Sequence, residues 1–458
     1  MKMNYEHKKV LVVGMARSGV AAAQLLRACG ADVMVNDSKS EEELGSQLYP
    51  LEGLQLTKRF GCSAMDLLEG QDCLVISPGI PDTAPFVVKA KEMGIYVIGE
   101  LELAAQLSRG VLTAVSGTNG KTTTVSLLGE MFANAGKVTH VVGNIGYPFS
   151  LAALVSREED VIVCEVSSFQ METADTFHPH VALLTNITED HLNRHGTMEV
   201  YTDLKMRMFR NQTADDYAVF NADDPGLNGL SRRVRSRVLK FSRKKEVREG
   251  AFVRDDMIWL RMDGNEKRIC SPEEIYIPGP HNLENALGAV CVAGAMKVPV
   301  PVIRHTLKTF RGVEHRIERV RELDGIVYIN DSKGTNVDST IKAIQTMNEP
   351  TVIILGGYDK HISFDPLAKE IAGSPVIRRA VLIGETAPLI QNALQRAGFR
   401  ETEFADTLGQ AVEQSRQAAG KGWNVLLSPA CASFDMFKDY EERGRVFKEI
   451  VQGLEPRA

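Results

Sequence analysis

The sequence has no excess of positive charge, no internal repeat and no apolar run long enough to form a membrane-spanning helix. Its 458 residues carry 53 lysines and arginines against 59 aspartates and glutamates, a formal net charge of −6, so a basic face for nucleic acid is not expected. Residues 1–9 are polar, and the apolar run after them is only one strand long, so we expect neither a signal peptide nor a membrane contact. These absences favour a cytoplasmic protein.

Paired cysteines are also absent. The seven cysteines are scattered and none forms a Cys-x-x-Cys pair, so we expect buried, reduced thiols rather than a disulfide framework. Hydrophobic residues make up 44% of the chain and charged residues 24%, as in a soluble globular protein. The chain is too long for one ordinary core, and about three domains are expected.

A glycine-rich stretch stands between a predicted strand, 111–116, and a predicted helix that begins near Thr122. Glycines let backbone N–H groups converge on a phosphate, the helix start adds positive potential, and a lysine reaches the terminal phosphates. A hydroxyl directly after that lysine suits Mg²⁺. Val115 stands where the standard phosphate loop has a further glycine, so the loop is a shortened variant. The stretch predicts a nucleoside triphosphate site and leaves the reaction open; it comprises Gly117, Thr118, Asn119, Gly120, Lys121, Thr122 and Thr123.

The first domain begins with a predicted βαβ unit, in which strands 9–13 and 31–36 flank an alanine- and leucine-rich helix. Ala16 replaces the second glycine of a dinucleotide-binding fingerprint, which denies a pyrophosphate its closest approach to the backbone. A nicotinamide dehydrogenase is one alternative for this unit, and Ala16 argues against it. The other is a different phosphate-bearing ligand, bound by Arg17 and Ser18 at the start of the helix.

Two further stretches of the first domain lie where ligands of open α/β sheets collect, at the carboxyl ends of strands. The turn 77–81, which contains Gly79, follows a predicted strand that begins at Cys73. The second strand of the βαβ unit closes with Asp37, Ser38 and Lys39, where a nucleoside would sit.

The middle of the chain contains one acidic residue, Glu165, in the otherwise apolar predicted strand 161–166. Burial of an uncompensated carboxylate is costly, so Glu165 is predicted to face a cation such as Mg²⁺, with a salt-bridged strand end as the alternative. His191 follows the predicted strand 181–186 and is a candidate for the same site. From the residues alone, Lys205 on the predicted helix 201–209 is expected to be a surface lysine paired with Asp203 or Glu199. Residues 231–268 are expected to form a surface β-hairpin region.

Polar residues follow three predicted strands of the last third of the chain, 327–330, 351–355 and 424–427. A second substrate is therefore expected at the carboxyl ends of these strands. Arg316 lies on a predicted linker, from which it could reach a nucleotide phosphate when domains close.

Taken together and in order, these stretches resemble the Mur ligase family, the ATP-dependent amide ligases of bacterial cell-wall synthesis. Within the family, residues 331–336 and 428–444 are similar to those of the members that add D-glutamate, and there is no Asp-Asn-Pro-Arg stretch of the kind used by the diaminopimelate-adding members. The resemblance implies a three-domain α/β fold. Its parts are a Rossmann-like domain over 1–99, a central P-loop ATPase-like domain over 100–312 and a Rossmann-like domain over 313–458.

The resemblance also implies a reaction, in which a substrate carboxylate attacks the γ-phosphate of ATP and an amine then displaces phosphate from the acyl phosphate. The implied substrates are UDP-N-acetylmuramoyl-L-alanine and D-glutamate, and the implied cofactors are two Mg²⁺ ions and a carbamylated lysine. A monomer is expected. Another ligase of the same architecture is a further alternative, such as a folate polyglutamate synthetase or the L-lysine-adding enzyme. An ATP-hydrolysing P-loop switch or motor is a third.

By resemblance, each ligand is assigned its residues. The catalytic residues are Lys121, Glu165, His191 and Lys205, and the metal ligands are Thr122, Glu165, His191 and carbamylated Lys205. Besides the phosphate loop, ATP contacts Asn285, Arg316, Asp331 and Lys333. The UDP-linked substrate contacts Arg17, Ser18, Asp37, Ser38, Lys39, Gly79, Asn144 and His191. D-glutamate contacts Lys333, Thr335, Lys360, Ser433, Phe434 and Tyr440.

Overall fold

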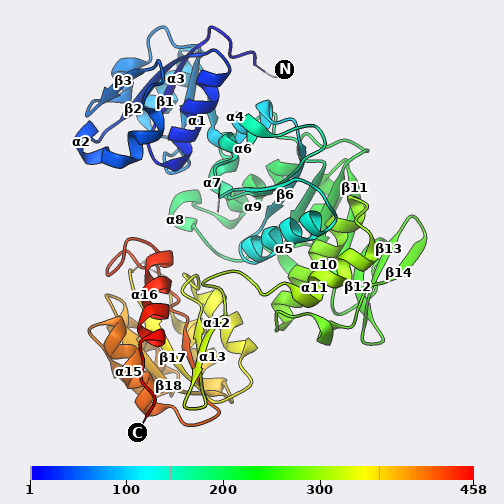
Figure 1. The fold of residues 1–458 in the computed structure, drawn as a ribbon, viewed down its shortest axis with the longest axis vertical. Helices are drawn as coiled ribbons and strands as arrows, with labels where there is room; N and C mark the ends of the chain where they lie inside the picture. Colours follow the sequence, from blue (N-terminus) through cyan, green and yellow to red (C-terminus); the bar gives the residue numbers. More distant parts are fainter. Residues whose placement is uncertain (1–2, 145–146, 360–361, 458) are drawn as a thin grey trace. The chain divides into compact units, whose positions relative to one another are not determined.

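The computed structural model describes residues 3–144, 147–359 and 362–457 (Figure 1). Lys360 lies outside these residues. The chain divides into two compact units, the first formed by Met1–Tyr276 and Asn282–Phe310 and the second by Ile277–His281 and Arg311–Ala458. Three α/β sheets, two in the first unit and one in the second, confirm the fold class predicted from the sequence.

The first sheet is parallel throughout and has the order β3-β2-β1-β4-β5. Its strands are β1 (Lys9–Val13), β2 (Asp32–Asp37), β3 (Thr57–Phe60), β4 (Cys73–Ile76) and β5 (Tyr96–Gly99), with helices α1 (Arg17–Ala28), α2 (Glu41–Leu44) and α3 (Pro85–Glu92). Both faces of β1 are covered, since Val10 and Val12 pack on the α1 side and Leu11 and Val13 on the α3 side. A strand buried on both faces is apolar throughout.

The second sheet has the order β14-β13-β12-β11-β10-β9-β6-β8-β7. Strands β6 to β12 run parallel, and β13 and β14 add an antiparallel edge. The strands are β6 (Val111–Ser116), β7 (Thr139–Gly143), β8 (Val161–Glu165), β9 (Val181–Leu184), β10 (Tyr217–Asn221), β11 (Arg237–Ser242), β12 (Gly250–Arg254), β13 (Met257–Met262) and β14 (Asn265–Arg268). The helices are α4 (Glu100–Leu107), α5 (Lys121–Asn134), α6 (Phe149–Val155), α7 (Ser168–Met171), α8 (Leu192–His195), α9 (Met198–Met206), α10 (Pro280–Ala295) and α11 (Val300–Thr309).

The expectation of a surface β-hairpin region over 231–268 is confirmed in part: β12, β13 and β14 pair as antiparallel hairpins and β14 is exposed, but β11 and the buried side chains of the region depart from it. Strand β11 pairs in parallel with β10 and extends the second sheet. Phe241, Phe252 and Ile258 are buried, and α10 covers this part of the sheet closely, because a Cβ on its Gly288 would lie 3.3 Å from the ring of Phe241. The helix that buries these side chains lies later in the sequence, so the local pattern could not reveal it.

The third sheet forms the second unit and has the order β15-β16-β20-β17-β18-β19, parallel except for β15. The strands are β15 (Glu318–Leu323), β16 (Ile326–Asn330), β17 (Thr351–Gly356), β18 (Ile377–Ile383), β19 (Thr402–Phe404) and β20 (Asn424–Leu427). One face packs against α12 (Val337–Thr346), α13 (Asp365–Gly373) and α14 (Ala387–Arg396), and the other against α15 (Leu408–Ala418) and α16 (Tyr440–Gln452). Short 3-10 helices cover Gly45–Leu51, Ala64–Leu67, Arg207–Phe209, Pro225–Leu227, Leu230–Arg233 and Pro272–Glu274.

Among the described residues, no helix combines the length and apolar character needed to cross a membrane. The cysteines are all free, as expected; five are buried, Cys29 is half-buried and Cys62 is exposed.

Within the first unit, one hydrophobic core continues from the first sheet to the second through α1, α4 and α6. Glu100, the first residue of α4, is 3% exposed, and one of its carboxylate oxygens accepts a hydrogen bond from the backbone N–H of Ser150, 2.6 Å away. Burial raises the pKa of Glu100, with this hydrogen bond opposing the shift. The negative charge is therefore unfavourable in the folded state.

We expect Glu100→Gln to stabilise the protein at neutral and alkaline pH. A native pKa above the unfolded value means that stability falls as pH rises from about 4.3 through the native pKa, and glutamine removes this loss while its amide oxygen still accepts from Ser150. The melting temperature of the variant should exceed that of the wild type at pH 8 and match it near pH 4.

The control is Glu102→Gln, on the same helix. The Glu102 carboxylate accepts backbone N–H groups from Asp175, Thr176 and Phe177 on both oxygens, so an amide NH₂ would face a donor. This variant should melt below the wild type at pH 8. A lower melting temperature for Glu100→Gln at pH 8 would contradict the prediction.

Candidate functional site

The phosphate loop joins β6 to α5, as predicted, and two of its glycines are required by close contacts. Gly117 and Gly120 have φ of +145° and +84°. A Cβ on Gly117 would lie 1.9 Å from the hydroxyl of Thr185, and one on Gly120 would lie 2.2 Å from the side-chain oxygen of Asn285. The loop therefore has room for backbone alone, and Asn285 of α10, assigned to ATP by the resemblance, lies against it.

Lys121 is the first residue of α5 and folds back over the loop. Its Nζ donates to the backbone oxygens of Gly117 and Thr118, each 2.8 Å away. The loop is fastened to the end of β9 by Asn186, whose side-chain oxygen accepts from the N–H of Asn119 at 2.9 Å. Lys121 therefore places a cationic group at the N-terminus of α5, the arrangement that binds phosphates.

Glu165, Thr122 and Asn144 form a polar cluster at the carboxyl ends of β6, β7 and β8, in which Glu165 and Thr122 are buried and Asn144 is exposed. Thr122 Oγ1 donates to one oxygen of Glu165 at 2.8 Å, and Asn144 Nδ2 donates to the other at 3.0 Å. Glu165 is 1% exposed. Both partners are uncharged, so the alternative of a salt-bridged strand end has no support among these contacts. A buried carboxylate beside a hydroxyl and an amide fits Mg²⁺, which prefers oxygen ligands.

Lys205 is buried, with 2% of its surface exposed, so the expectation of a surface lysine is wrong. Its Nζ donates to the backbone oxygen of Gly117 at 2.8 Å and lies 4.6 Å from the ring centre of Tyr201, one turn earlier on α9. Asp203, the partner expected from the sequence, instead pairs with Arg233. The side of α9 that carries Tyr201 and Lys205 faces the phosphate loop.

The surroundings of Lys205 favour its neutral form. Burial lowers its pKa well below the ordinary value, the charge of Lys121 acts in the same direction, and Asp190 and Glu165 oppose the shift. The amines of Lys121 and Lys205 both donate to the backbone oxygen of Gly117. Tertiary packing therefore brings the Lys205 amine to the phosphate loop.

His191 directly precedes α8 and has a left-handed backbone, with φ of +56°. Its backbone N–H donates to the side chain of Asp190 at 2.9 Å. The ring of Phe169 lies edge-on to its imidazole at 4.7 Å. This packing sets the orientation of the imidazole, which is partly exposed.

In the first domain, the strand order reverses between β1 and β4, and the predicted ligand residues lie at that switch point. Arg17, Ser38, Lys39 and Gly79 are exposed there, and Ser18 is half-buried. Asp37 differs, because its carboxylate accepts the backbone N–H groups of Met15 and Lys39 at 2.7 and 3.0 Å. These hydrogen bonds hold the turn that follows β1 in place.

In the second unit, Asp331 lies buried at the end of β16. Burial raises its pKa to about 6, against the effect of Arg316, and Ser428 Oγ donates to it at 2.7 Å. Lys333 Nζ lies 5.2 Å from the ring centre of Tyr440. The remaining predicted residues follow the same strand ends, with Thr335 half-buried, Ser433 buried and Phe434 66% exposed.

Sequence reasoning missed Arg443, whose guanidinium ties two of these strand ends together. It is 1% exposed and donates to the backbone oxygens of Ser332, Cys431 and Ala432 at 2.8, 3.1 and 3.3 Å. The only local signal was a charged residue in the first turn of a helix, which is normally a solvent-exposed position.

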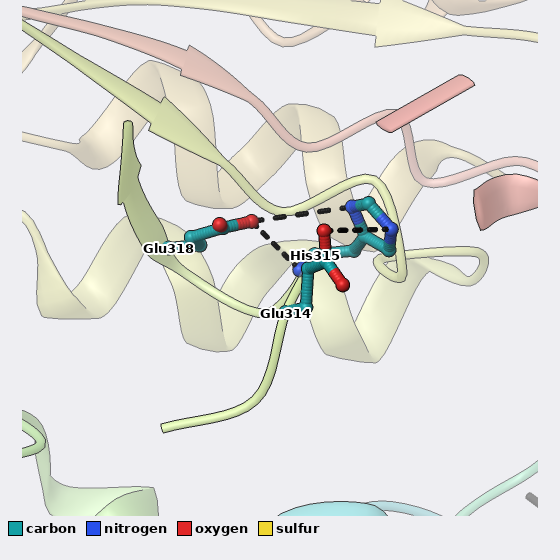
Figure 2. Close-up of side chains that lie close together, drawn as sticks. All are labelled: Glu314, His315 and Glu318. Atoms are coloured by element: carbon teal, nitrogen blue, oxygen red, sulfur yellow. Dashed lines mark hydrogen bonds and ion pairs between the residues drawn. The ribbon is translucent and has the colours of Figure 1, made fainter. Parts of the chain in front are cut away.

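Figure 2 shows that Glu314, His315 and Glu318 converge on the linker beside Arg316. Their ligand atoms lie within 4.8 Å of one another, close enough to hold a metal ion. Lys448, however, donates to both carboxylates at 2.8 and 2.7 Å. The ammonium group of Lys448 therefore already lies between the two carboxylates and offsets one of their charges, so this cluster is an ion-pair network.

A groove of about 730 Å³ lies beside β10, β11 and residues 245–249. None of the predicted site residues lines it, and its charged lining includes both signs, such as Lys245 and Glu246. This groove is therefore not the predicted nucleotide or substrate site, despite its size.

The fold and the phosphate loop define a P-loop nucleotide-binding protein built from three α/β sheets. Its sequence matches the profiles of three successive domains of one family, described as Mur ligase MurD-like N-terminal domain (residues 8–99), Mur ligase middle domain (115–293) and Mur ligase glutamate ligase domain (315–431). The chain belongs to the Mur ligase family. Members of this family are ligases that use ATP and Mg²⁺.

Curated relatives match over nearly the whole chain. UDP-N-acetylmuramoylalanine--D-glutamate ligase from Thermoanaerobacter sp. (strain X514) is 46% identical over 99% of this chain and 100% of its own length, and the enzyme of that name from Pelotomaculum thermopropionicum is 47% identical over 99% of each. Among solved structures, the ligase MurC from Thermotoga maritima has a TM-score of 0.60 at 21% identity, covering 97% of this chain and 99% of its own. MurF from Acinetobacter baumannii has a TM-score of 0.62 at 16% identity, covering 97% and 91%.

Proposed function

We propose that this chain joins D-glutamate to UDP-N-acetylmuramoyl-L-alanine with ATP, in the synthesis of a peptidoglycan precursor. The observation that carries the proposal is the cluster at the phosphate loop, where Thr122 bonds to the buried Glu165 and Lys205 reaches Gly117. The near-complete match to relatives of that activity supports the choice of substrates. We further propose that it acts as a monomer.

The first step is phosphate transfer between anions. A carboxylate oxygen of the UDP-linked substrate bonds to the γ-phosphorus, and the bond to the β-phosphate oxygen breaks to release ADP. Lys121 and the N–H groups at the start of α5 hold the phosphates, and Asn144 and His191 orient the carboxylate. Thr122, Glu165 and His191 would hold Mg²⁺, two ions in our proposal. When bound, Mg²⁺ offsets repulsion between carboxylate and triphosphate.

The second step forms the amide. The amine of D-glutamate bonds to the acyl carbon, the bond to the phosphate oxygen breaks, and the nitrogen loses a proton. In the proposal Lys333, Thr335, Lys360, Ser433, Phe434 and Tyr440 surround D-glutamate, while Asn285, Arg316, Asp331 and Lys333 contact ATP. Arg443 supports this site indirectly, since it holds the loops that carry Lys333 and Ser433.

We also propose that Lys205 is carbamylated, and the burial that lowers the pKa of its amine supports this proposal. Its neutral amine would attack the carbon of CO₂ and lose a proton, which converts a cation into a carboxylate at the end of the same side chain. A cationic Lys205 beside Lys121 would repel Mg²⁺, whereas the carbamate would bind it. Burial next to Glu165 and the phosphate loop supports this assignment.

The proposed activity is tested by ADP release from the purified chain. Release over many turnovers should require both UDP-N-acetylmuramoyl-L-alanine and D-glutamate, because the amine is needed to discharge the acyl phosphate before the next turnover. Omission of either substrate, or replacement of D-glutamate by L-lysine, is the control. Release that continues beyond one ADP per enzyme without an amino acid, or is equally fast with L-lysine, would refute the proposed substrates and favour a P-loop hydrolase or a ligase of different specificity.

A further inference from the structure

Arg194 connects the first domain to the loop that carries His191. It lies in α8, three residues after His191, and its guanidinium donates to the backbone oxygens of Gly79 and Ile80 at 3.4 and 3.3 Å. Both oxygens belong to the turn after β4, at the switch point of the first sheet. Arg194 was not predicted as a functional residue, because its partners lie 114 and 115 residues earlier in the chain.

The same guanidinium is held in place from the other side. Nε and Nη2 donate to the two oxygens of Glu172 at 3.1 and 2.6 Å, and the guanidinium carbon lies 5.0 Å from the ring centre of Phe169. The side chains of Glu172 and Arg194 are 8% and 20% exposed. A two-pronged pair between planar groups specifies direction as well as distance, and at this exposure it is more than a surface ion pair.

The ring of Phe169 lies between the two groups: it packs against the guanidinium of Arg194 and contacts the imidazole of His191 edge-on. A second link runs through His195, whose ring accepts from or donates to Ser168 at 3.0 Å and approaches Glu172 at 3.6 Å. Segments α7 and α8 therefore form one packed block, and Arg194 is the group of that block that donates to the turn at Gly79.

We infer that Arg194 is a positioning residue that holds the first-domain turn at a set distance from His191, and so aligns the two ends of one long substrate. The inference rests on the proposed function, in which the UDP end contacts Gly79 and the carboxylate end lies near His191. Binding at both ends aligns the carboxylate for attack only if the spacing between the two places is maintained. Lysine cannot replace the arginine, because a single ammonium group cannot match the carboxylate fork and the two carbonyls together.

The test compares Arg194→Lys with the wild type in the binding of two probes, UDP-N-acetylmuramoyl-L-alanine and UDP alone. The variant should bind the full substrate about ten- to a hundredfold more weakly, as expected for loss of charged hydrogen bonds that align it, and bind UDP within about twofold of the wild type. The KM for ATP should stay within about twofold, and kcat should fall. Equal weakening of both probes would show that Arg194 only supports the first-domain turn and would overturn the inference.

Arg210→Ala is the matched control. Arg210 also donates to two backbone oxygens, those of Ala174 and Asp175, and to the Asp175 carboxylate, but all of these lie within the middle domain. It should leave both probes unaffected. Glu172→Gln is the second variant, since it retains size and removes one arm of the fork. Glu172→Gln should also weaken the binding of the full substrate more than the binding of UDP, and equal weakening of both would again contradict the inference.

If the proposed function is wrong, the wild-type protein will not bind the full substrate, and this outcome is distinct from the results above. In that case hydrogen exchange tests the connection itself. The backbone N–H of Ile80 donates to the oxygen of Ser77 within the turn. Its exchange should be faster in Arg194→Lys than in the wild type and unchanged in Arg210→Ala, and unchanged exchange in Arg194→Lys would overturn the inference.

Discussion

Replacement of Lys121 by alanine is expected to abolish ADP release while the protein still binds UDP-N-acetylmuramoyl-L-alanine. The Lys121 ammonium lies at the N-terminus of α5 and over the phosphate loop, so its charge acts where negative charge accumulates during transfer. Loss of one such preorganised donor costs about 10²–10³ in rate, and loss of a full charge is expected to reach at least the upper value. The UDP end is assigned to the first sheet, at Gly79 and Lys39, so its binding should be retained.

The measurements are ADP release and calorimetric binding of the UDP-linked substrate. Lys137→Ala is the control, because Lys137 is an exposed lysine just beyond the end of α5. It should leave both quantities unchanged. If Lys121→Ala weakens binding of the UDP-linked substrate as much as it slows ADP release, the separation of the two sites proposed here is wrong.

Replacement of Lys205 by alanine is expected to leave almost no activity, and small carboxylates such as acetate are expected to restore part of it. The side chain is buried beside Gly117, and burial lowers the pKa of its amine well below the usual range, which favours the neutral amine that reacts with CO₂. Alanine removes the carbamate and leaves a space in which acetate can place a carboxylate near Glu165. Activity should therefore rise with acetate concentration and saturate.

Lys205→Arg makes this prediction specific. Arginine places a permanent positive charge at this position, is not expected to form the carbamate, and fills the space that acetate would need, so this variant should be inactive with or without acetate. A carbonyl signal from ¹³CO₂-treated protein should be present in the wild type and missing from both variants. Full activity of Lys205→Ala without any additive would show that this lysine has no catalytic part.

The sequence by itself determined the elements in which local pattern and final environment agree. Strands β1, β6 and β20 begin and end at the predicted residues, because a strand buried on both faces is a continuous apolar run with polar residues at its ends. The phosphate loop could also be predicted from the sequence. A phosphate site of this kind needs glycines, whose N–H groups converge, and a lysine at the helix start, and all of these lie within a few consecutive residues. The same is true of Glu165, which was a single acid in an apolar strand.

Tertiary structure alone decided which charged side chains leave the solvent. Lys205 has the local pattern of a surface lysine, yet α9 turns it toward Gly117, 88 residues earlier in the chain. Arg443 is buried by contacts to the loops that follow β16 and β20, and Arg194 is partly buried by its pair with Glu172. A long charged side chain costs little when exposed and much when buried unpaired, so its role depends on partners that only the folded chain brings within reach.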